Sequence, residues 1–376
     1  MRLFFGRRRD GWRLRGPRHE RSFPPLLKND GRWVSVIRIL FGMVLLAQAL
    51  SAFAARLSPP LEALRKSTNG IVVATVQSIR LDPAAIEIKV EKRLHGLKRE
   101  RLFVRVDPFV LPRIEVGGRY VLVYAAHITD RAKPGRMIDL AEPILLTTDG
   151  AAPAMFRDEA QALTLLAPSH AEVEKAPSYR AWLVSQLSAD DPSMRDLAAA
   201  ELVLHPGLAE ALTSKEALSV LAAIVDEVSL PSTRARLFGA AAQQRIALTP
   251  EQLRAPANAI LMTLPVISTE DMFNPETLAS VVLSFAQTHP ELIDARALPR
   301  WLRSARAALV EQAALVIRAQ APDKELAAIN LAFADSWLPA STRGFLQDHL
   351  RRLHLSLIHI SEPTRLRRIS YAVFCL

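Results

Sequence analysis

Hydrophobic and polar residues follow a two-residue period in the first structured part of the chain. The segment "GIVVATVQSI" from Gly70 is rich in β-branched residues, and residues 86–90 alternate isoleucine and valine with glutamate and lysine. This alternation is typical of a strand with one face in solvent. Further strands are expected at 101–106, 119–126 and 143–148, so a small β-barrel-like domain is predicted over residues 64–148.

A helical period replaces the alternation over residues 155–354. Two stripes of residues three or four positions apart are expected to face the core. They consist of Leu218, Leu221, Ala222 and Val225, and of Leu278, Val281, Val282 and Phe285. This part of the chain is therefore predicted to be almost entirely helical.

Helix starts are well marked in this region. Glu216 follows Thr213 by three residues, and Gln252 follows Thr249 by three, which is the spacing of a capping box. Proline is common at the first helical position, and three further helices are expected to begin at Pro192, Pro231 and Pro275.

Short segments of the helical region recur. "LPSTRARLF" at Leu230 is similar to "LPASTRGFL" at Leu338, and "HPGLAEAL" at His205 is similar to "HPELIDARAL" at His289, 84 residues later. Paired helices that repeat every 40 to 47 residues or so are typical of HEAT-type solenoids. The predicted fold class is therefore α+β, with a small OB-like β-barrel followed by an all-α HEAT-like array; an irregular helical bundle is the alternative.

Residues 190–202, "DDPSMRDLAAAEL", resemble one HEAT-type repeat. The resemblance implies that Asp191 lies at the turn between paired helices and that Arg195 opens the second helix. It also implies packing positions for Ala198, Ala199 and Leu202.

The N-terminal residues read as a targeting segment. Residues 1–33 form an arginine-rich extension, which we interpret as the product of a start codon assigned too early. Residues 34–54 combine a basic flank, an apolar run and a small-x-small pattern at Ala52 and Ala54, so cleavage before Ala55 is expected. The alternative is an uncleaved membrane anchor, because the apolar stretch reaches the lower length limit of a span.

The C-terminal residues 355–376 differ from everything before them. "LSLIHISEPTR" and "ISYAVFCL" resemble translations of the two ends of a transposon-type adapter used to prepare DNA libraries for sequencing. We therefore treat this tail as artefactual and expect the native sequence to diverge after His354. The tail contains Cys375, the only cysteine of the sequence.

Setting both termini aside changes the meaning of the charge. The chain has 48 basic and 38 acidic residues; residues 1–54 hold 11 and 3 of these and residues 355–376 hold 3 and 1, which leaves 34 of each. The high pI is then no argument for nucleic-acid binding. Residues 55–146 carry a net charge of +6 and residues 147–354 one of −6, so the two parts are expected to attract each other.

The order "VEKRLHG…IEVGGRYVLVY", over residues 90–124, resembles bacterial domains related to the netrin-like module of tissue inhibitors of metalloproteinases. The resemblance implies an OB-type barrel. In it, His95-Gly96 follows a strand, and Gly118-Arg119-Tyr120 opens a later strand that supplies core aromatics. Those inhibitors chelate zinc through an N-terminal cysteine, which this chain does not have there, so inhibition by that route is not implied.

Familiar enzyme motifs are absent from the sequence. It has no phosphate-binding glycine-rich loop, no Gly-x-Ser-x-Gly and no His-Glu-x-x-His, and we identify no cofactor or metal motif. The histidines are scattered, and we interpret them as surface or capping residues. The adjacent carboxylates at 190–191 and 270–271 precede expected helices, where a helix N-terminus favours negative charge.

The most distinctive surface feature is a run of cations in "KVEKRLHGLKRERLFVR". Two interpretations remain open: a solvated hairpin whose charges prevent edge pairing, or an anion-binding strip for an acidic envelope component. Oligonucleotide binding is not expected, because only one aromatic residue interrupts the charges. The strip consists of Lys89, Lys92, Arg93, Lys98, Arg99, Arg101 and Arg105.

These observations favour an exported, non-enzymatic binding or scaffold protein of the cell envelope, periplasmic or secreted. The helical array would bind a protein partner, and the chain would touch the membrane only through an uncleaved N-terminal segment. Two alternatives remain open: an envelope hydrolase or other enzyme whose site assembles only in three dimensions, and an anchored subunit of a membrane complex. A large pocket with convergent carboxylates and histidines would favour an enzyme.

Overall fold

The computed structural model describes residues 59–129, 137–148, 152–157, 159–167, 177–266 and 275–353. These described residues belong to one compact unit. The predicted cleavage residues Ala52, Ala54 and Ala55 and the tail 355–376 lie outside the described residues. Among the described helices, none combines the length and the apolar character needed to cross a membrane.

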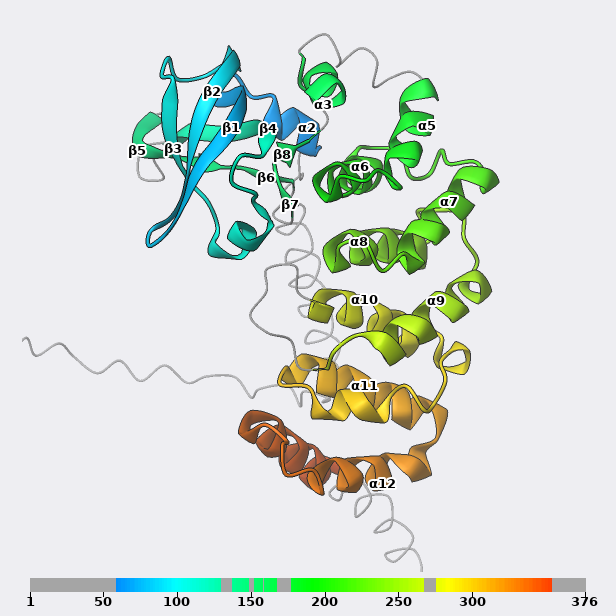
Figure 1. Cartoon of the computed structure of the whole chain (residues 1–376). Coiled ribbons are helices and arrows are strands. Elements are labelled where there is room, and N and C mark those ends of the chain that lie inside the picture. Colours follow the sequence, from blue (N-terminus) through cyan, green and yellow to red (C-terminus); the bar gives the residue numbers. More distant parts are fainter. Residues whose placement is uncertain are drawn as a thin grey trace, which may run out of the picture. The chain divides into compact units, whose positions relative to one another are not determined.

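The first described strands are β1 (Asn69–Leu81), β2 (Ala84–His95), β3 (Arg101–Arg105), β4 (Arg119–Thr129) and β5 (Met137–Leu145). They close into a five-stranded barrel in the order β1-β2-β3-β5-β4, with β4 pairing back onto β1 (Figure 1). The β3–β5 contact is parallel and the other pairings are antiparallel. The predicted small β-barrel is therefore confirmed.

The predicted last strand, 143–148, is wrong in its limits. β5 begins at Met137, six residues before the predicted start, and ends at Leu145. The chain leaves β5 at Leu146, and Thr147–Thr148 form a separate short strand, β6, that pairs with β7 (Ala152–Pro153). The final strand, β8 (Met155–Phe156), pairs with β4.

Alternation places one side of each strand inside the barrel. In β3, Leu102 and Val104 are buried while Arg101, Phe103 and Arg105 are exposed. The connection from β3 to β4 contains a short 3-10 helix, η1 (Pro108–Arg113). The barrel interior consists mainly of Val72, Ala74, Val76, Ile86, Ile88, Leu102, Val104, Tyr120, Leu122 and Tyr124.

Three glycines give room to two core tyrosines. A Cβ on Gly70 would lie 2.1 Å from the Tyr124 ring, and one on Gly96 would lie 2.6 Å from both the Gly70 Cα and the Tyr124 hydroxyl. A Cβ on Gly118 would lie 2.6 Å from the Tyr120 ring. Gly96 also has φ +110°, a conformation that side chains rarely adopt. Gly96 of "HG" and Gly118 of "GGRY" are thus required by packing inside the barrel.

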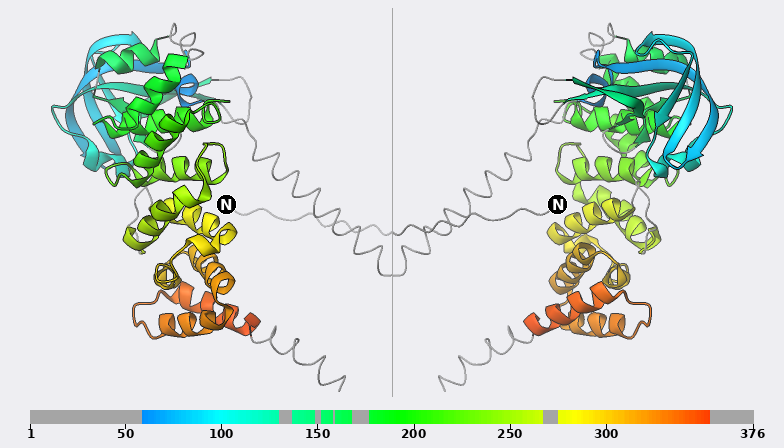
Figure 2. Two further views of the ribbon diagram at one scale, coloured as in Figure 1. Left: turned by 90° about the vertical axis from the view of Figure 1, so that its right-hand side faces the viewer. Right: turned by 90° about the vertical axis from the view of Figure 1, so that its left-hand side faces the viewer.

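The remaining described chain is helical apart from short turns. Helices α6, α8, α10 and α11 pack against one another in that order, and α5, α7 and α9 form a second rank beside them (Figures 1 and 2). A last helix covers residues 340–353. The other elements are α2 (Pro60–Leu64), α3 (Glu159–Leu166), α5 (Pro177–Gln186), α6 (Pro192–Leu204), α7 (Ser214–Val225), α8 (Pro231–Ala242), α9 (Pro250–Thr263), α10 (Pro275–Thr288), η2 (Pro290–Leu292), η3 (Pro299–Arg303), α11 (Ala307–Gln320) and α12 (Pro322–Phe333).

The predicted helix starts are confirmed. Thr213 and Thr249 each accept a hydrogen bond from the backbone N–H three residues later, and the Glu216 and Gln252 side chains complete both capping boxes. The Asp191 side chain caps α6. α6, α8 and α10 begin at the three predicted prolines.

One of the two predicted core stripes is wrong. On α10, Leu278, Val282 and Phe285 are buried as expected. On α7, however, the buried residues are Ala217, Val220, Ala223 and Ile224, while Leu218 and Val225 are 51% and 47% exposed. The helix is apolar on two faces, and the sequence period could not show which of them packs. The face that packs against the array combines two alanines with Val220 and Ile224.

Helix α6 joins the barrel to the helical array through two fully buried carboxylates. Asp196 accepts hydrogen bonds from the Thr148 and Thr233 hydroxyls at 2.5 and 2.7 Å and pairs with Arg236 at 3.1 Å. Glu201 accepts a 2.6 Å hydrogen bond from the Leu61 backbone N–H at the start of α2. Both ends of the barrel region are thereby fixed to one helix.

A shared hydrophobic core reinforces this junction. Ile71 and Val73 of β1 and Val121 and Val123 of β4 point out of the barrel and belong to the same buried cluster as the helices. The outer face of these two strands is therefore an internal surface of the unit.

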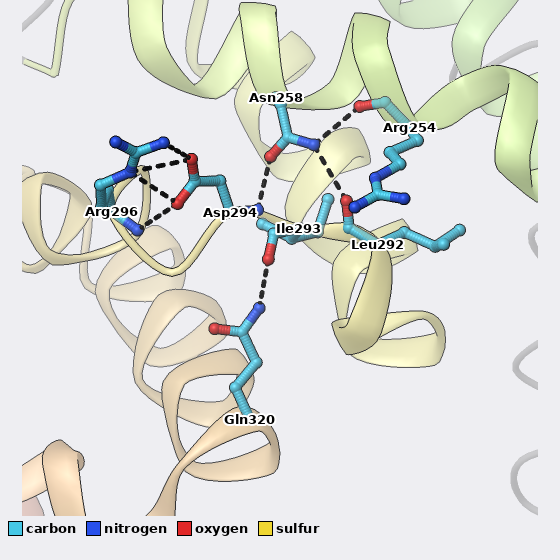
Figure 3. A network of polar contacts seen from close by, with 7 residues as sticks. All are labelled: Arg254, Asn258, Leu292, Ile293, Asp294, Arg296 and Gln320. Carbon is cyan, nitrogen blue, oxygen red and sulfur yellow. Dashed lines mark hydrogen bonds and ion pairs between the residues drawn. The ribbon is translucent and has the colours of Figure 1, made fainter.

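The irregular segment after α10, which contains "HPELIDAR", is held by side-chain amides (Figure 3). Asn258 of α9 donates to the Leu292 carbonyl at 2.9 Å and accepts from the Asp294 N–H at 2.6 Å. Gln320 of α11 donates to the Ile293 carbonyl at 2.7 Å. Two helices thus satisfy the polar backbone of a stretch that forms neither a strand nor an α-helix.

Candidate functional site

All seven residues of the predicted basic strip are exposed. Lys89, Lys92 and Arg93 lie on β2, Lys98 and Arg99 in the following turn, and Arg101 and Arg105 on β3. Lys89 and Arg101 are direct neighbours across the two strands. The structure thus gathers the whole strip on one hairpin, as the alternation predicted.

Carboxylates divide the strip into two halves. On the strands, Glu87 lies 3.8 Å from Arg101. Glu91 accepts hydrogen bonds from Thr75 and from Arg119, at 2.5 and 2.7 Å, and these bonds lower the pKa of Glu91. At the turn, none of the four cations pairs with a carboxylate among the described residues. Among the described residues, Arg101 is thus the one member of the strip with a carboxylate within 4 Å, and four of the remaining cations, Lys92, Arg93, Lys98 and Arg99, lie at or next to the β2–β3 turn.

A hollow of about 370 Å³ opens beside this turn, which we call the turn pocket. Arg93 and His95 line it from the β2 side, and Ser67 and Thr68 line it from the turn between α2 and β1. His95 Nδ1 lies 2.7 Å from the Asn69 carbonyl oxygen. Because a carbonyl only accepts, Nδ1 carries the proton in this contact and Nε2 is the remaining ring nitrogen. The rest of the lining is Leu94, Gly96, Leu97 and Ala126.

A larger groove of about 740 Å³ lies between α5 and α7 in the second rank of helices. Its walls are mostly small residues. They include Ala181, Ser185 and Ser188 on the α5 side and Ser219, Ala222 and Ala223 on α7. Small side chains on both helices leave the space between them open.

The groove also contains two carboxylates, each engaged by an arginine. Glu216 lies 3.2 Å from Arg180, and Asp226 lies 2.5 Å from Arg195. Burial alone raises the pKa of each acid, but hydrogen bonds and the arginine charge outweigh it and lower both pKa values. Lys215 is the other charged residue of the lining, which includes no histidine. Both acids are therefore ionised and paired, which is unlike the convergent acid and base groups expected for an enzyme.

The misassigned stripe of α7 borders this groove. Leu218 is 51% exposed and Val225 47% exposed, and Val228 just beyond the helix is 71% exposed. Ala222 lies one helical turn from Leu218 and belongs both to this stripe and to the groove lining. We call this surface the α7 ridge; it consists of Leu218, Leu221, Ala222, Val225 and Val228.

Of the adjacent carboxylates at 190–191, Asp191 caps helix α6. Asp191 accepts hydrogen bonds from the Ser193 N–H at 2.9 Å and from the Arg157 N–H at 2.8 Å. Burial nevertheless raises the pKa of Asp191, because these bonds only partly offset the loss of water. Glu270 and Asp271 lie outside the described residues.

One histidine does not fit the surface or capping interpretation. His349 is buried, and its Nε2 lies 2.8 Å from Glu325 and 3.2 Å from Arg318, which itself pairs with Glu325 at 2.8 Å. Its partners lie 24 and 31 residues away on α12 and α11. Spacing along the chain could not reveal this group, because only the stacking of these helices assembles it. Within the described ranges, no three His, Cys, Asp or Glu side chains are placed to hold a metal ion.

Comparisons with known proteins add no assignment. No family model matches the chain, and neither a curated protein nor a solved structure is significantly similar to it. The functional argument therefore rests on the residues and geometry described above.

Proposed function

We propose that this protein is an exported binding protein whose helical array holds a protein partner on the α7 ridge and the adjoining groove. The observation that carries the proposal is the reversal on α7. Leu218 and Val225, which a helix of this kind would ordinarily bury, lie in solvent beside a hollow of about 740 Å³. Exposed apolar patches next to a groove and rimmed by polar residues are typical of protein interaction sites.

The partner's chemistry follows from the surface. The ridge would take aliphatic or aromatic side chains. The groove, with its serine hydroxyls and small residues, would accept a narrow segment such as a helix edge or an extended chain. The paired acids Glu216 and Asp226 leave little free charge to attract a strongly basic partner.

A HEAT-type relationship is part of the proposal and is supported by recurring contacts. Arg195, Arg234 and Arg343 lie near the starts of three helices, and each donates to a backbone carbonyl of the segment that precedes its helix. Thr233 and Thr342, in the two similar "STR" segments, are both buried, and each donates a hydrogen bond to a residue 37 or 38 positions earlier. The recurrence of buried threonines and of arginine donors at similar helix positions supports a repeat relationship.

The barrel is proposed to be OB-like, related to the netrin-like module. The closed order of its five strands and the packing of Gly96 and Gly118 against core tyrosines support this relationship. Export is proposed from residues 34–54 alone. Sequencing the N-terminus of protein recovered from the envelope fraction tests it, and a start at Ala55 is expected. Intact chain in the inner membrane would instead support the anchored alternative.

Site-specific crosslinking tests the binding site in the cell. A photoreactive phenylalanine analogue at position 218 should form a discrete adduct with one protein. The same analogue at position 331 on α12, where Leu331 is 60% exposed, provides a matched control. Identical adducts from both positions would argue against a specific site.

The captured protein is then purified and titrated against the full-length chain. Leu218→Asp should weaken binding about tenfold or more, because a charge would replace an apolar anchor at the centre of the interface. Leu331→Asp should leave the affinity within about twofold. Equal affinity of the Leu218→Asp variant and wild type would refute the proposed site.

A further inference from the structure

The turn pocket lies beside a group of exposed cations on the barrel. Lys92, Arg93, Lys98 and Arg99 are exposed within eight consecutive residues, and among the described residues none of them pairs with a carboxylate. The neighbouring Glu91 is already occupied by Thr75 and Arg119. Clustered cations that lack partners raise the local concentration of anions.

The pocket supplies hydrogen-bond donors as well as charge. Ser67, Thr68, Arg93 and His95 line the same hollow, and one guanidinium nitrogen of Arg93 donates to the Leu97 carbonyl at 3.4 Å. Arginine and hydroxyl donors that converge from two chain segments suit the oxygens of a tetrahedral anion. The hollow of about 370 Å³ is at the small end of ligand sites, which fits a head group better than a large molecule.

The backbone around the pocket is held firmly. The Leu97 N–H donates to the Tyr124 hydroxyl at 3.1 Å, and His95 is hydrogen-bonded to the Asn69 carbonyl. Gly96 fits against Gly70 with no space for a side chain. The donors therefore stand on a rigid frame, so an incoming anion would not have to order a loose loop.

We propose that the turn pocket binds a phosphate group, presented either by a soluble phosphate ester or by the head group of a phospholipid. Arg93 and the two hydroxyls contact the phosphate oxygens, and the surrounding lysines and Arg99 add long-range attraction. The inference goes beyond the proposed partner site, because it uses the barrel and no residue of the α7 ridge. Failure of either proposal leaves the other intact.

Two probes distinguish the sources of phosphate. Inositol hexakisphosphate, titrated into the full-length protein by calorimetry, represents a soluble ester. Co-sedimentation with phosphatidylcholine vesicles containing phosphatidic acid represents a head group. Binding to the first probe alone identifies soluble esters, and binding to the vesicles alone identifies a membrane surface. Binding to neither probe overturns the proposal.

Matched variants separate a pocket from diffuse attraction. Arg93→Gln should weaken binding to the effective probe about tenfold. Arg105→Gln removes the same charge from an exposed position of the same hairpin outside the pocket and should change the affinity by about twofold or less. Ser67→Ala with Thr68→Ala, which alters no charge, should still weaken binding about threefold to tenfold. Equal effects of Arg93→Gln and Arg105→Gln, or no effect of the hydroxyl variant, would overturn the pocket.

Folding is checked on the variant that removes the most charge. Lys92, Arg93, Lys98 and Arg99 changed together to Gln should leave the melting curve nearly unchanged, since exposed substitutions usually alter stability by less than about 0.5 kcal/mol each. If this variant keeps the wild-type melting curve and still binds the probe with wild-type affinity, the proposal is wrong. If it unfolds, Ser67→Ala with Thr68→Ala serves as the deciding variant.

Discussion

Asp196→Ala should be the most damaging single truncation at the junction of barrel and helices. The carboxylate is fully buried and accepts hydrogen bonds from the Thr148 hydroxyl, the Thr233 hydroxyl and Arg236, at 2.5, 2.7 and 3.1 Å. The Ala152 N–H is a fourth donor, at 3.3 Å. Removing one partner of a buried ion pair typically costs about 3–5 kcal/mol, and a hydrogen bond to a charged group contributes about 1.5–3 kcal/mol.

The lower part of that range applies here. The Arg236 side chain is 13% exposed to solvent, so water can hydrate it in part once Asp196 is removed. We therefore expect a loss of about 3 kcal/mol in the free energy of unfolding. With a urea dependence near 3 kcal/mol/M, the midpoint should fall by about 1 M.

The assay is urea unfolding of the full chain, followed by circular dichroism and by tryptophan fluorescence. Thr233→Val removes one of the four donors and should cost about 1.5 kcal/mol. Asp348→Ala, which breaks an exposed pair with Arg351, should cost less than about 0.5 kcal/mol. If Asp196→Ala unfolds at the same urea concentration as Asp348→Ala, the buried carboxylate does not stabilise the junction and the reasoning fails.

Two further outcomes are expected. Burial raises the pKa of Glu325, but hydrogen bonds from Arg318 and His349 outweigh this effect, so the folded-state pKa lies below the ordinary value of 4.5. This contribution to stability is present above pH 4.5 and is lost as the pH falls through the lowered pKa. Glu325→Gln should therefore have a lower free energy of unfolding than wild type at pH 7, and this difference should become smaller in acid. A difference that stays the same between pH 7 and about pH 3.5 would contradict the prediction. The second outcome concerns Gly96→Ala and Gly117→Ala, which both place a side chain at positive φ, while only Gly96 has backbone within 2.6 Å of the new Cβ. Gly117→Ala should reduce the stability of the fold by about 1–2 kcal/mol and Gly96→Ala by clearly more, as thermal melts of the two variants would show. Equal losses of stability would mean that the barrel shifts to accommodate a side chain at position 96.

Local sequence determined most of the elements of this protein. The Thr213 and Thr249 capping boxes and the prolines at 192, 231 and 275 mark helix starts where the structure has them, because capping involves only neighbouring residues. The alternation in β3 likewise decided which side chains enter the barrel and that Arg101 and Arg105 would be exposed.

Tertiary structure alone decided how these elements face one another. α7 is apolar on two sides, and only its packing against the array decided that Ala217, Val220, Ala223 and Ile224 are buried while Leu218 and Val225 face solvent. His349 joins partners that lie 24 and 31 positions before it, and the four donors around Asp196 lie 37 to 48 positions from it. The turn pocket likewise needs Ser67 and Thr68 beside Arg93, which depends on how β1 and β2 pair. Such contacts are set by packing between elements, and no local pattern encodes them.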